Sequence, residues 1–248
     1  MVNAIILAGD SKGFPVKDVA NKALIKIKGR FMVEYIIESL RHAKFVDKII
    51  VVGSEELRRA VGDIVTAVLE CEDSIIKNTK LGIDFFGENK HIIICTCDIP
   101  LVSSEAIDDF IKQCTNKNVD IGYPIIEKSL NDRKYPDVKR TYVKMKDGIY
   151  TGGNIIYVNP VVIKRCYSIA EELVENRKNA IKMGRTLGIW TLIRLCLGIL
   201  KIQSVEKRAY KILGVNARAI ETLYPEIGND VDKIEDVDFV NKYINIGA

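Results

Sequence analysis

Three continuous apolar runs, each ending in a polar or glycine-containing segment, restrict this chain to a small number of folds. The runs are Ala4–Leu7, Lys48–Val52 and His91–Cys97. Met32–Ala43 has helical spacing after the first run, and Ser54 is placed to cap a helix after the second. Ser103 or Ser104 is placed to cap a third helix that extends through Ile111.

Apolar strands that alternate with helices indicate a mostly parallel sheet covered on both faces. The order of the elements therefore predicts an α/β chain with a Rossmann-like, three-layer sandwich and a mixed, mostly parallel sheet. Ligands of such sheets bind at the carboxyl ends of the strands. We expect the loops after Leu7, Val52 and Cys97 to surround one crevice.

The pattern changes near Asp120. Extra strands are predicted over 121–126, 141–145 and 153–158, with a long polar loop over 127–139. The remainder is predicted to be helical over 160–223 and again over 235–244. Because no repeat, low-complexity tract or linker interrupts the chain, residues 1–248 are expected to form a single domain.

Composition limits the partners of the chain. The 248 residues are 48% hydrophobic, which is enough for one large domain with a core. The net charge of +4 comes from interspersed acidic and basic residues, so nucleic acid is not expected as a partner. The six cysteines lack the paired spacing of a zinc site or a disulfide framework. We expect them to be reduced and mostly buried, with Cys95 and Cys97 in the core.

The loop after the first run has features of a phosphate-binding loop. A glycine such as Gly9 after a strand lets backbone amides approach phosphates, and Lys22 is placed by the same loop to neutralise their charge. The loop is not a Walker A loop, because no Gly-Lys-Ser/Thr ends it. It also lacks the G-x-G-x-x-G spacing of dinucleotide-binding loops.

Acidic residues in two segments are candidate metal ligands. Asp98 follows the third apolar run, where a carboxylate at the carboxyl end of a strand suits a hard cation such as Mg²⁺. Asp230 and Asp232 point the same way in an extended segment and would complete such a site. The alternatives are a capping or turn aspartate at Asp98 and an acidic first helical turn near Glu235.

A third group of candidates precedes and includes a glycine pair. Gly152 and Gly153 permit close backbone approach to a ligand, and Asn154 beside them is suited to bond sugar hydroxyls. A plain hairpin turn is the alternative. Arg140, in a basic stretch upstream, is suited to hold an anionic ligand, although a solvated basic loop explains the same stretch.

Taken together, these segments resemble the nucleotidyltransferase family that includes molybdenum-cofactor guanylyltransferases and the CMP-sugar and sugar-phosphate nucleotidyltransferases. The family signature L-A-G-G-x-x-x-R, P-K, G-x-P-M and its later motifs have counterparts, in order, in Ala4–Gly9, Asn21–Leu24, Gly29-Arg30 with Met32, Asp98–Leu101, Gly152–Asn154 and Asp230–Asp232. The resemblance implies a glycosyltransferase-A-like fold, a nucleotide half over about 1–120 and an acceptor half over about 121–248. It also implies transfer of an NMP group from an NTP to a small phosphorylated or sugar-like acceptor, with release of pyrophosphate.

By this resemblance, residues of the first loop bind the nucleotide, and the catalytic groups are Lys22, Lys12 and Asp98. The nucleotide-binding positions are Leu7, Ala8, Gly9, Asp10 and Lys22. Mg²⁺ or Mn²⁺ is expected on Asp98, Asp230 and Asp232, and the acceptor on Arg140, Gly152, Gly153 and Asn154. Three positions depart from the signature: Asp10 replaces its second glycine, Lys12 is the nearest substitute for its arginine, and Asn21 replaces its proline.

Two other functions remain open. A nucleotide-sugar-dependent glycosyltransferase shares the sheet and a metal-binding aspartate, but Thr96 stands where its Asp-x-Asp motif would begin. A catalytically degenerate, nucleotide-binding regulatory module is consistent with the altered first loop. Release of pyrophosphate, release of NDP, or binding without turnover distinguishes the three.

The segment 187–202 is almost wholly apolar apart from Arg194. It is shorter than the roughly 20 residues of a membrane-spanning helix. A buried helix, a homodimer interface and a peripheral helix on an anionic membrane surface are the three interpretations, and the last would suit a lipid-linked acceptor. The N-terminus lacks the pattern of a signal peptide, so a cytoplasmic location is expected.

Overall fold

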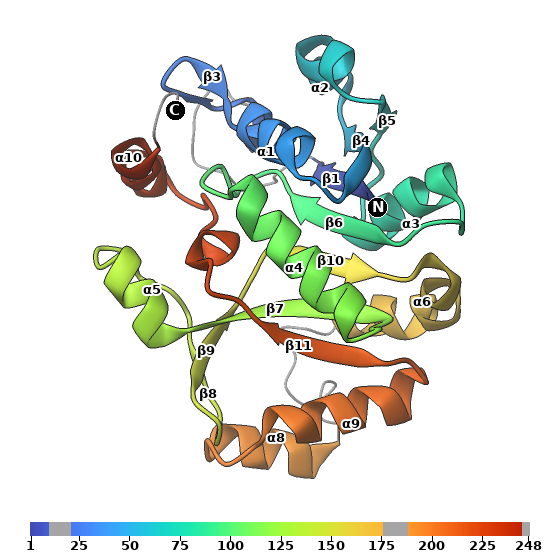
Figure 1. Cartoon of the computed structure of the whole chain (residues 1–248), viewed down its shortest axis with the longest axis vertical. Coiled ribbons are helices and arrows are strands. Elements are labelled where there is room, and N and C mark those ends of the chain that lie inside the picture. Colours follow the sequence, from blue (N-terminus) through green and yellow to red (C-terminus); the bar gives the residue numbers. More distant parts are fainter. Residues whose placement is uncertain (10–20, 176–187, 245–248) are drawn as a thin grey trace.

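A computed structural model describes residues 1–9, 21–175 and 188–244 (Figure 1). Within these residues a main sheet of nine strands has the order β5-β4-β1-β6-β10-β7-β9-β8, and β11 pairs with β7. The bounds are β1 Val2–Ala8, β4 Val46–Gly53, β5 Ala67–Glu70, β6 Ile92–Thr96, β7 Ile121–Glu127, β8 Val143–Lys144, β9 Ile149–Gly152, β10 Ile155–Val158 and β11 Ala217–Glu221. The short strands β2 (Lys26–Ile27) and β3 (Arg30–Phe31) form a separate hairpin.

The sheet is mixed and mostly parallel, as predicted. Strands β5, β4, β1 and β6 pair in parallel, and β11 pairs in parallel with β7. Strand β10 lies antiparallel between β6 and β7, and it thereby joins the strands before residue 120 to those after it. The predicted division into a nucleotide half and an acceptor half is thus spanned by one continuous sheet.

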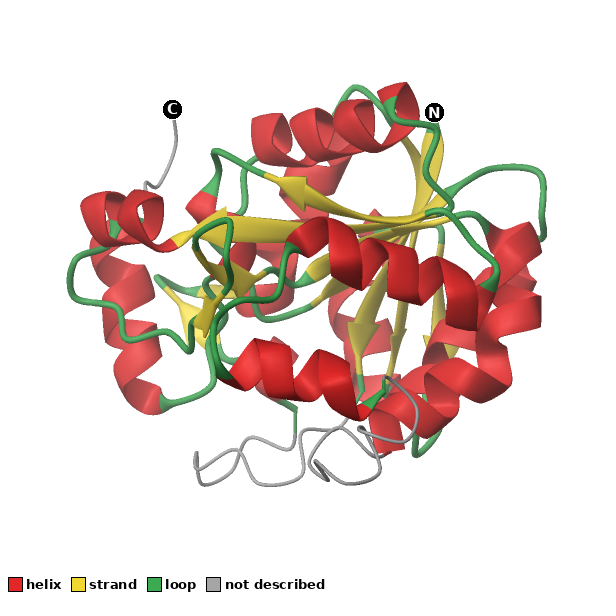
Figure 2. Ribbon diagram, turned by 90° about the horizontal axis from the view of Figure 1, so that it is seen from below, coloured by secondary structure: helices red, strands yellow, loops and turns green. Residues whose placement is uncertain are grey.

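Helices cover both faces of this sheet and give the three layers (Figure 2). On one face lie α1 (Met32–His42), α2 (Glu55–Val61) and α4 (Ser104–Asn116), whose apolar residues belong to the largest core cluster. On the other face lie α3 (Ile75–Phe86) and α6 (Pro160–Glu175). The Rossmann-like sandwich expected from the alternation of strands and helices is therefore confirmed.

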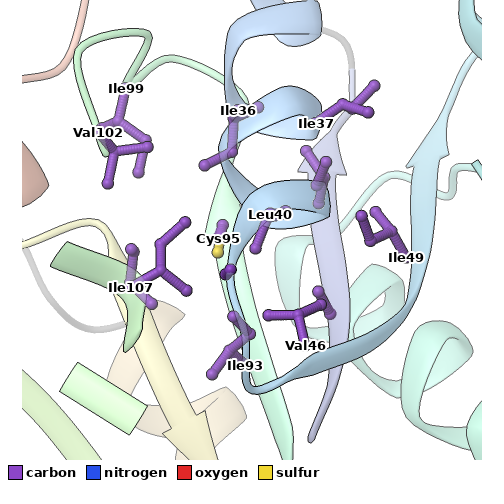
Figure 3. Packing of buried hydrophobic residues seen from close by; sticks show 14 of the residues in the cluster. Ile36, Ile37, Leu40, Val46, Ile49, Ile93, Cys95, Ile99, Val102 and Ile107 are labelled. Atoms are coloured by element: carbon purple, nitrogen blue, oxygen red, sulfur yellow. The ribbon is translucent and has the colours of Figure 1, made fainter. Parts of the chain in front are cut away.

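The largest core cluster shows why α1 forms where the spacing predicts it. Ile36, Ile37 and Leu40 lie on one side of the helix and are fully buried against the sheet. Figure 3 shows Leu40 next to Cys95 of β6, with Ile36 and Ile37 one turn away along the helix. Because these side chains recur every three to four residues, one helical face buries all of them at once.

The strand register aligns the carboxyl ends of the central strands. Leu7 pairs with Val52 of β4 on one side and with Thr96 of β6 on the other. Since paired residues of parallel strands lie side by side, the loops that follow Ala8, Gly53 and Cys97 leave the sheet at one edge. This edge is the place where the sequence predicts a crevice.

Two predictions of local structure beyond residue 120 are wrong. The predicted loop 127–139 contains the helix α5 (Lys128–Lys134). The region 160–223, predicted to be helical, contains α6, α8 (Ile189–Cys196) and α9 (Ile202–Leu213), but it ends in the strand β11. Alanine-rich residues 217–219 favour a helix, and the parallel pairing with β7, which buries Ile220, overrides that preference.

The segment around α8 is mostly exposed, so the interpretation of 187–202 as a buried helix is wrong for its described part. Leu200 is buried, but Trp190 and Leu197 have exposed fractions of 74% and 65%. Among the helices of the described residues, none combines the length and apolar character of a membrane span. Of the six cysteines, Cys71 is partly buried and Cys196 exposed, while the buried ones are Cys95, Cys97, Cys114 and Cys166, as expected.

Candidate active site

A buried asparagine links the end of β1 to the predicted lysine. Asn21 is 1% exposed, and its side-chain amide donates a hydrogen bond to the Ala8 carbonyl oxygen at 2.7 Å. Its side-chain oxygen accepts from the Ala23 amide at 2.9 Å and so caps the short 3₁₀ helix Lys22–Leu24. The position that departs from the family proline therefore carries two bonds that place Lys22 beside the strand ends. The role of Asn21 was not predicted.

Lys22 bridges two of the predicted carboxylates. Its ammonium group forms an ion pair with Asp98, and it lies 3.4 Å from the carboxylate of Asp232. Burial on its own would lower the pKa of Lys22, but the negative charge of Asp98 and its hydrogen bond outweigh that effect and raise the pKa. Lys22 is therefore held in its charged form.

A backbone hydrogen bond joins Asp98 to the 230–232 segment. The Val231 amide donates to the Asp98 carbonyl oxygen at 2.9 Å, and the Val231 side chain is fully buried. As a result, carboxylate oxygens of Asp98, Asp230 and Asp232 lie within 4.8 Å of one another. The alternative of an acidic first turn holds for Asp236, whose side chain accepts from the Lys233 amide at the start of α10 (Ile234–Tyr243).

Arg140 joins this cluster from the segment before β8. Its guanidinium forms an ion pair with Asp230, and each side chain has an exposed fraction of 17%. Burial would raise the pKa of Asp230, but the hydrogen bond and charge of Arg140 lower it. Burial and the charge of Asp230 raise the pKa of Asp232, against the attraction of Lys22. The pKa values of Asp230 and Asp232 thus shift in opposite directions, because only Asp230 is paired with Arg140. At Arg140 the interpretation as a solvated loop is wrong.

The glycine pair lies beside the same edge, and it is not a hairpin turn. Strands β9 and β10 both run antiparallel to β7, and the chain bends between them as the Gly153 amide donates to the Pro124 carbonyl oxygen. A Cβ atom at Gly153 would lie 2.6 Å from the Ile227 side chain, so only glycine fits. The carbonyl oxygen of Asn154 accepts from the Thr96 amide, which places Asn154 next to the strand that leads to Asp98.

The structure thus brings together Lys22, Asp98, Arg140, Asp230 and Asp232, with Leu7, Ala8 and Gly9 at the neighbouring strand end. Asp10 and Lys12 lie outside the described residues.

A buried amide pair near the site was not predicted from the sequence. The side-chain amide of Asn229 donates to the Asn131 side-chain oxygen at 3.1 Å and fixes the chain just before Asp230. Its signal was a lone asparagine next to the acidic motif.

The chemistry of the cluster fits a hard divalent cation. Asp98 Oδ1 is buried and accepts no hydrogen bond, so it has lone pairs available to a cation. Carboxylate oxygens are the ligands that Mg²⁺ and Mn²⁺ prefer. Three carboxylates face only two cationic side chains, Lys22 and Arg140, so the described cluster carries a formal negative charge.

The fold is that of the nucleotidyltransferases. The sequence model for the MobA-like NTP transferase domain matches residues 4–185, and the chain belongs to this family. Lys22 and Asp98 fall within the matched region, whereas Asp230 and Asp232 lie beyond it.

Solved structures and curated relatives agree with the family. A structure described as a hypothetical transferase from Thermus thermophilus is 31% identical, with a TM-score of 0.85 over 95% of this chain and 99% of that chain. A CMP:2-keto-3-deoxy-manno-octonic acid synthetase complexed with CTP shares the fold at 13% identity, with a TM-score of 0.68 over 98% of both chains. The 2-C-methyl-D-erythritol 4-phosphate cytidylyltransferase of Dictyoglomus thermophilum is 30% identical over 50% of this chain and 57% of its own length. The chain spans less than two thirds of the curated relatives it matches.

Proposed function

We propose that this chain is a metal-dependent nucleotidyltransferase that moves an NMP group from an NTP to a small phosphorylated or sugar-like acceptor and releases pyrophosphate. The observation that carries this proposal is the meeting of Lys22 with Asp98, Asp230 and Asp232 at the carboxyl edge of the sheet. One amine and three carboxylates at such an edge suit a metal-bound triphosphate.

Lys22 would supply positive charge to the α-phosphate and to the leaving pyrophosphate. A charge fixed in place before the reaction stabilises the developing charge without reorganisation. Asn21 holds the backbone of Lys22, so the amine needs only to exchange the carboxylate of Asp98 for a phosphate oxygen. Leu7, Ala8 and Gly9 would contact the base and ribose. Asp10 is a further proposed nucleotide-binding residue, and Lys12 would assist Lys22.

Asp98, Asp230 and Asp232 would hold Mg²⁺ or Mn²⁺, with Lys22 displaced toward the nucleotide. When bound, such an ion polarises phosphoryl oxygens and orients the reacting groups. The unpartnered Oδ1 of Asp98 supports this assignment.

Arg140 and the glycine pair would bind the acceptor. The Nε atom of Arg140 is buried without a hydrogen-bond partner, and so is the Nδ2 atom of Asn154. Both are donors, and buried donors without partners carry a cost that an anionic or hydroxylated acceptor would relieve. Gly152 and Gly153 let the side chains of Tyr123 and Ile227 pack against the backbone beside Asn154.

Release of pyrophosphate with each of the four NTPs, Mg²⁺ and pooled acceptors tests this function. For Lys22→Ala we expect kcat to fall by about 10²- to 10³-fold, the usual cost of removing one preorganised donor. For Asp98→Asn we expect kcat to fall at least as far, because the change removes a proposed metal ligand. Lys112→Ala, an exposed change on α4, is the control and should keep full activity.

Other outcomes favour the alternatives. Release of NDP from a nucleotide-sugar would make the chain a glycosyltransferase. Tight binding of one NTP with no turnover of any acceptor would make it a regulatory module.

A further inference from the structure

An apolar groove lies between the sheet and the helices α8 and α9, which Figure 1 shows below β8 and β11. Its volume is about 440 Å³, within the roughly 300–1,000 Å³ of small-molecule sites. Side chains of the sheet and of the segment from α8 to α9 form its walls, among them Ile121, Ile125, Met145, Leu195, Leu200 and Val205. The proposed reaction leaves this groove unexplained.

The lining offers little to a polar ligand. The carboxylate of Glu206 is already paired, because it accepts from the Arg218 guanidinium at 2.9 Å and from the Ala219 amide at 3.0 Å. The remaining walls are mostly aliphatic. A sugar would leave its hydroxyls unpaired there, whereas an alkyl or isoprenoid chain would gain free energy from leaving water.

The groove leads to the candidate active site. Gly152 and Tyr123 line it, and a Cβ atom at Gly152 would lie 2.1 Å from the Tyr123 hydroxyl oxygen. The carbonyl oxygen of Gly152 also lies next to Gly228, just before Asn229 and Asp230. The groove therefore reaches Gly152, which contacts the chain two residues before Asp230, and Asp230 is the ion-pair partner of Arg140.

The outer end of the groove is basic. Thr191 and Leu200 line both the groove and a neighbouring hollow, whose other residues include Arg194 and Lys207. Lys201 is nearby and exposed. The phosphate of the acceptor proposed below lies at the other end of the groove, so these basic side chains are not part of its binding site.

We propose that the groove holds the apolar chain of the acceptor, and that the acceptor is a phosphate monoester on an alkyl or isoprenoid chain whose phosphate meets Arg140. This inference rests on the proposed function. In the transfer, an oxygen of the acceptor dianion forms a bond to the α-phosphorus, and the bond between α-phosphorus and the bridging oxygen breaks. Pyrophosphate leaves with the electron pair, so the product is a nucleoside diphosphate ester of the chain and no proton is exchanged.

Calorimetric titration of the full chain with ethyl, hexyl and decyl phosphate, each below its micelle concentration, tests the inference. Affinity should rise about two- to fourfold per added methylene, as burial of each group predicts. Val205→Asp should weaken decyl phosphate by at least tenfold and leave ethyl phosphate unchanged. Ala209→Trp, which fills the groove without a charge, should have the same effect.

Val161→Asp on α6 is the matched control, because Val161 and Val205 have exposed fractions of 42% and 41% on helices of the same molecule. It should not change the affinity for decyl phosphate. An equal loss of affinity for decyl phosphate in both aspartate variants would overturn the inference. Affinity that does not depend on chain length would also overturn it. A dimer in sedimentation velocity that Val205→Asp dissociates, without binding of decyl phosphate, would assign the groove to a second copy and also overturn it.

The thermal shift caused by NTP and Mg²⁺, measured on the same samples, separates the two proposals. If this shift persists while chain length has no effect on binding, only the groove assignment fails. If the shift is absent while decyl phosphate binds in the groove, the proposed function fails.

Discussion

Asn21 and Arg140 determine how the charged groups of the site are arranged. Asn21 fixes the backbone from which Lys22 extends, and Arg140 gives Asp230 a lower pKa than its neighbour Asp232. Asp98 is buried with one oxygen left without a partner. At the scale of residues, the site is therefore a set of carboxylates with unequal neighbours rather than a uniform acidic patch.

Asn21→Ala should weaken both the fold and the site. The change removes the bonds to the Ala8 carbonyl and the Ala23 amide, so we expect a loss of about 1–3 kcal/mol in the free energy of unfolding. Because the backbone of Lys22 is then no longer held in place, kcat should fall further than in a variant that is destabilised equally at a position away from the site. Asn21→Asp keeps the acceptor for Ala23 and should recover part of the stability; urea unfolding and initial rates on the same samples measure both. Wild-type kcat in Asn21→Ala would contradict the positioning role.

Secondary structure was predictable where the signal was local. The fully apolar strands β1, β4 and β6 and the spaced apolar residues of α1 and α4 gave patterns that sequence alone carries. Strand β11 was not predictable, because its conformation depends on pairing with β7, almost one hundred residues earlier. Helix α5 was hidden by its polar composition, since its stability comes partly from contacts such as the ion pair of Lys134 with buried Glu226.

The packing of α3 on β1 depends on Gly82. A Cβ atom there would lie 2.7 Å from Ile5 Cδ1 in the middle of β1, so Gly82→Ala should destabilise the protein by about 1–3 kcal/mol. Gly62→Ala is the matched control, because Gly62 has helical dihedral angles and its nearest atom would be 3.8 Å away. That variant should be neutral or slightly more stable. Thermal unfolding of both variants checks the contrast, and similar melting temperatures would show that α3 does not pack closely on β1.

At the scale of the whole molecule, the site is assembled from segments that are distant in sequence. The ordered motifs made it predictable that Lys22, Asp98 and Asp230 would converge, because strand ends of a parallel sheet share one edge. The pairing of Arg140 with Asp230 was not predictable, because it depends on how α5 and the segment after it fold back over the edge.

Val231 connects the C-terminal segment to the nucleotide half. Its side chain is buried with Ile27 and Met32, and its amide binds the Asp98 carbonyl oxygen. Val231→Ala and Val240→Ala remove equally buried valines of the same cluster, and each should cost roughly 1–3 kcal/mol. Only Val231→Ala should also weaken the Mg²⁺-dependent binding of NTP, because it loosens Asp230 and Asp232. Calorimetric titration with NTP and Mg²⁺ provides the readout, and equal affinities in both variants would argue against this coupling.

The central claim is that one lysine and three carboxylates hold a metal-bound triphosphate at a single edge of the sheet. A thermal-shift screen of the four NTPs with and without Mg²⁺ on wild type, Lys22→Ala and Asp98→Ala tests it most directly, because a ligand that binds the folded state raises the melting temperature. We expect one NTP to raise the melting temperature of the wild type only when Mg²⁺ is present, and we expect both variants to lose this shift. Equal shifts in all three proteins would contradict it.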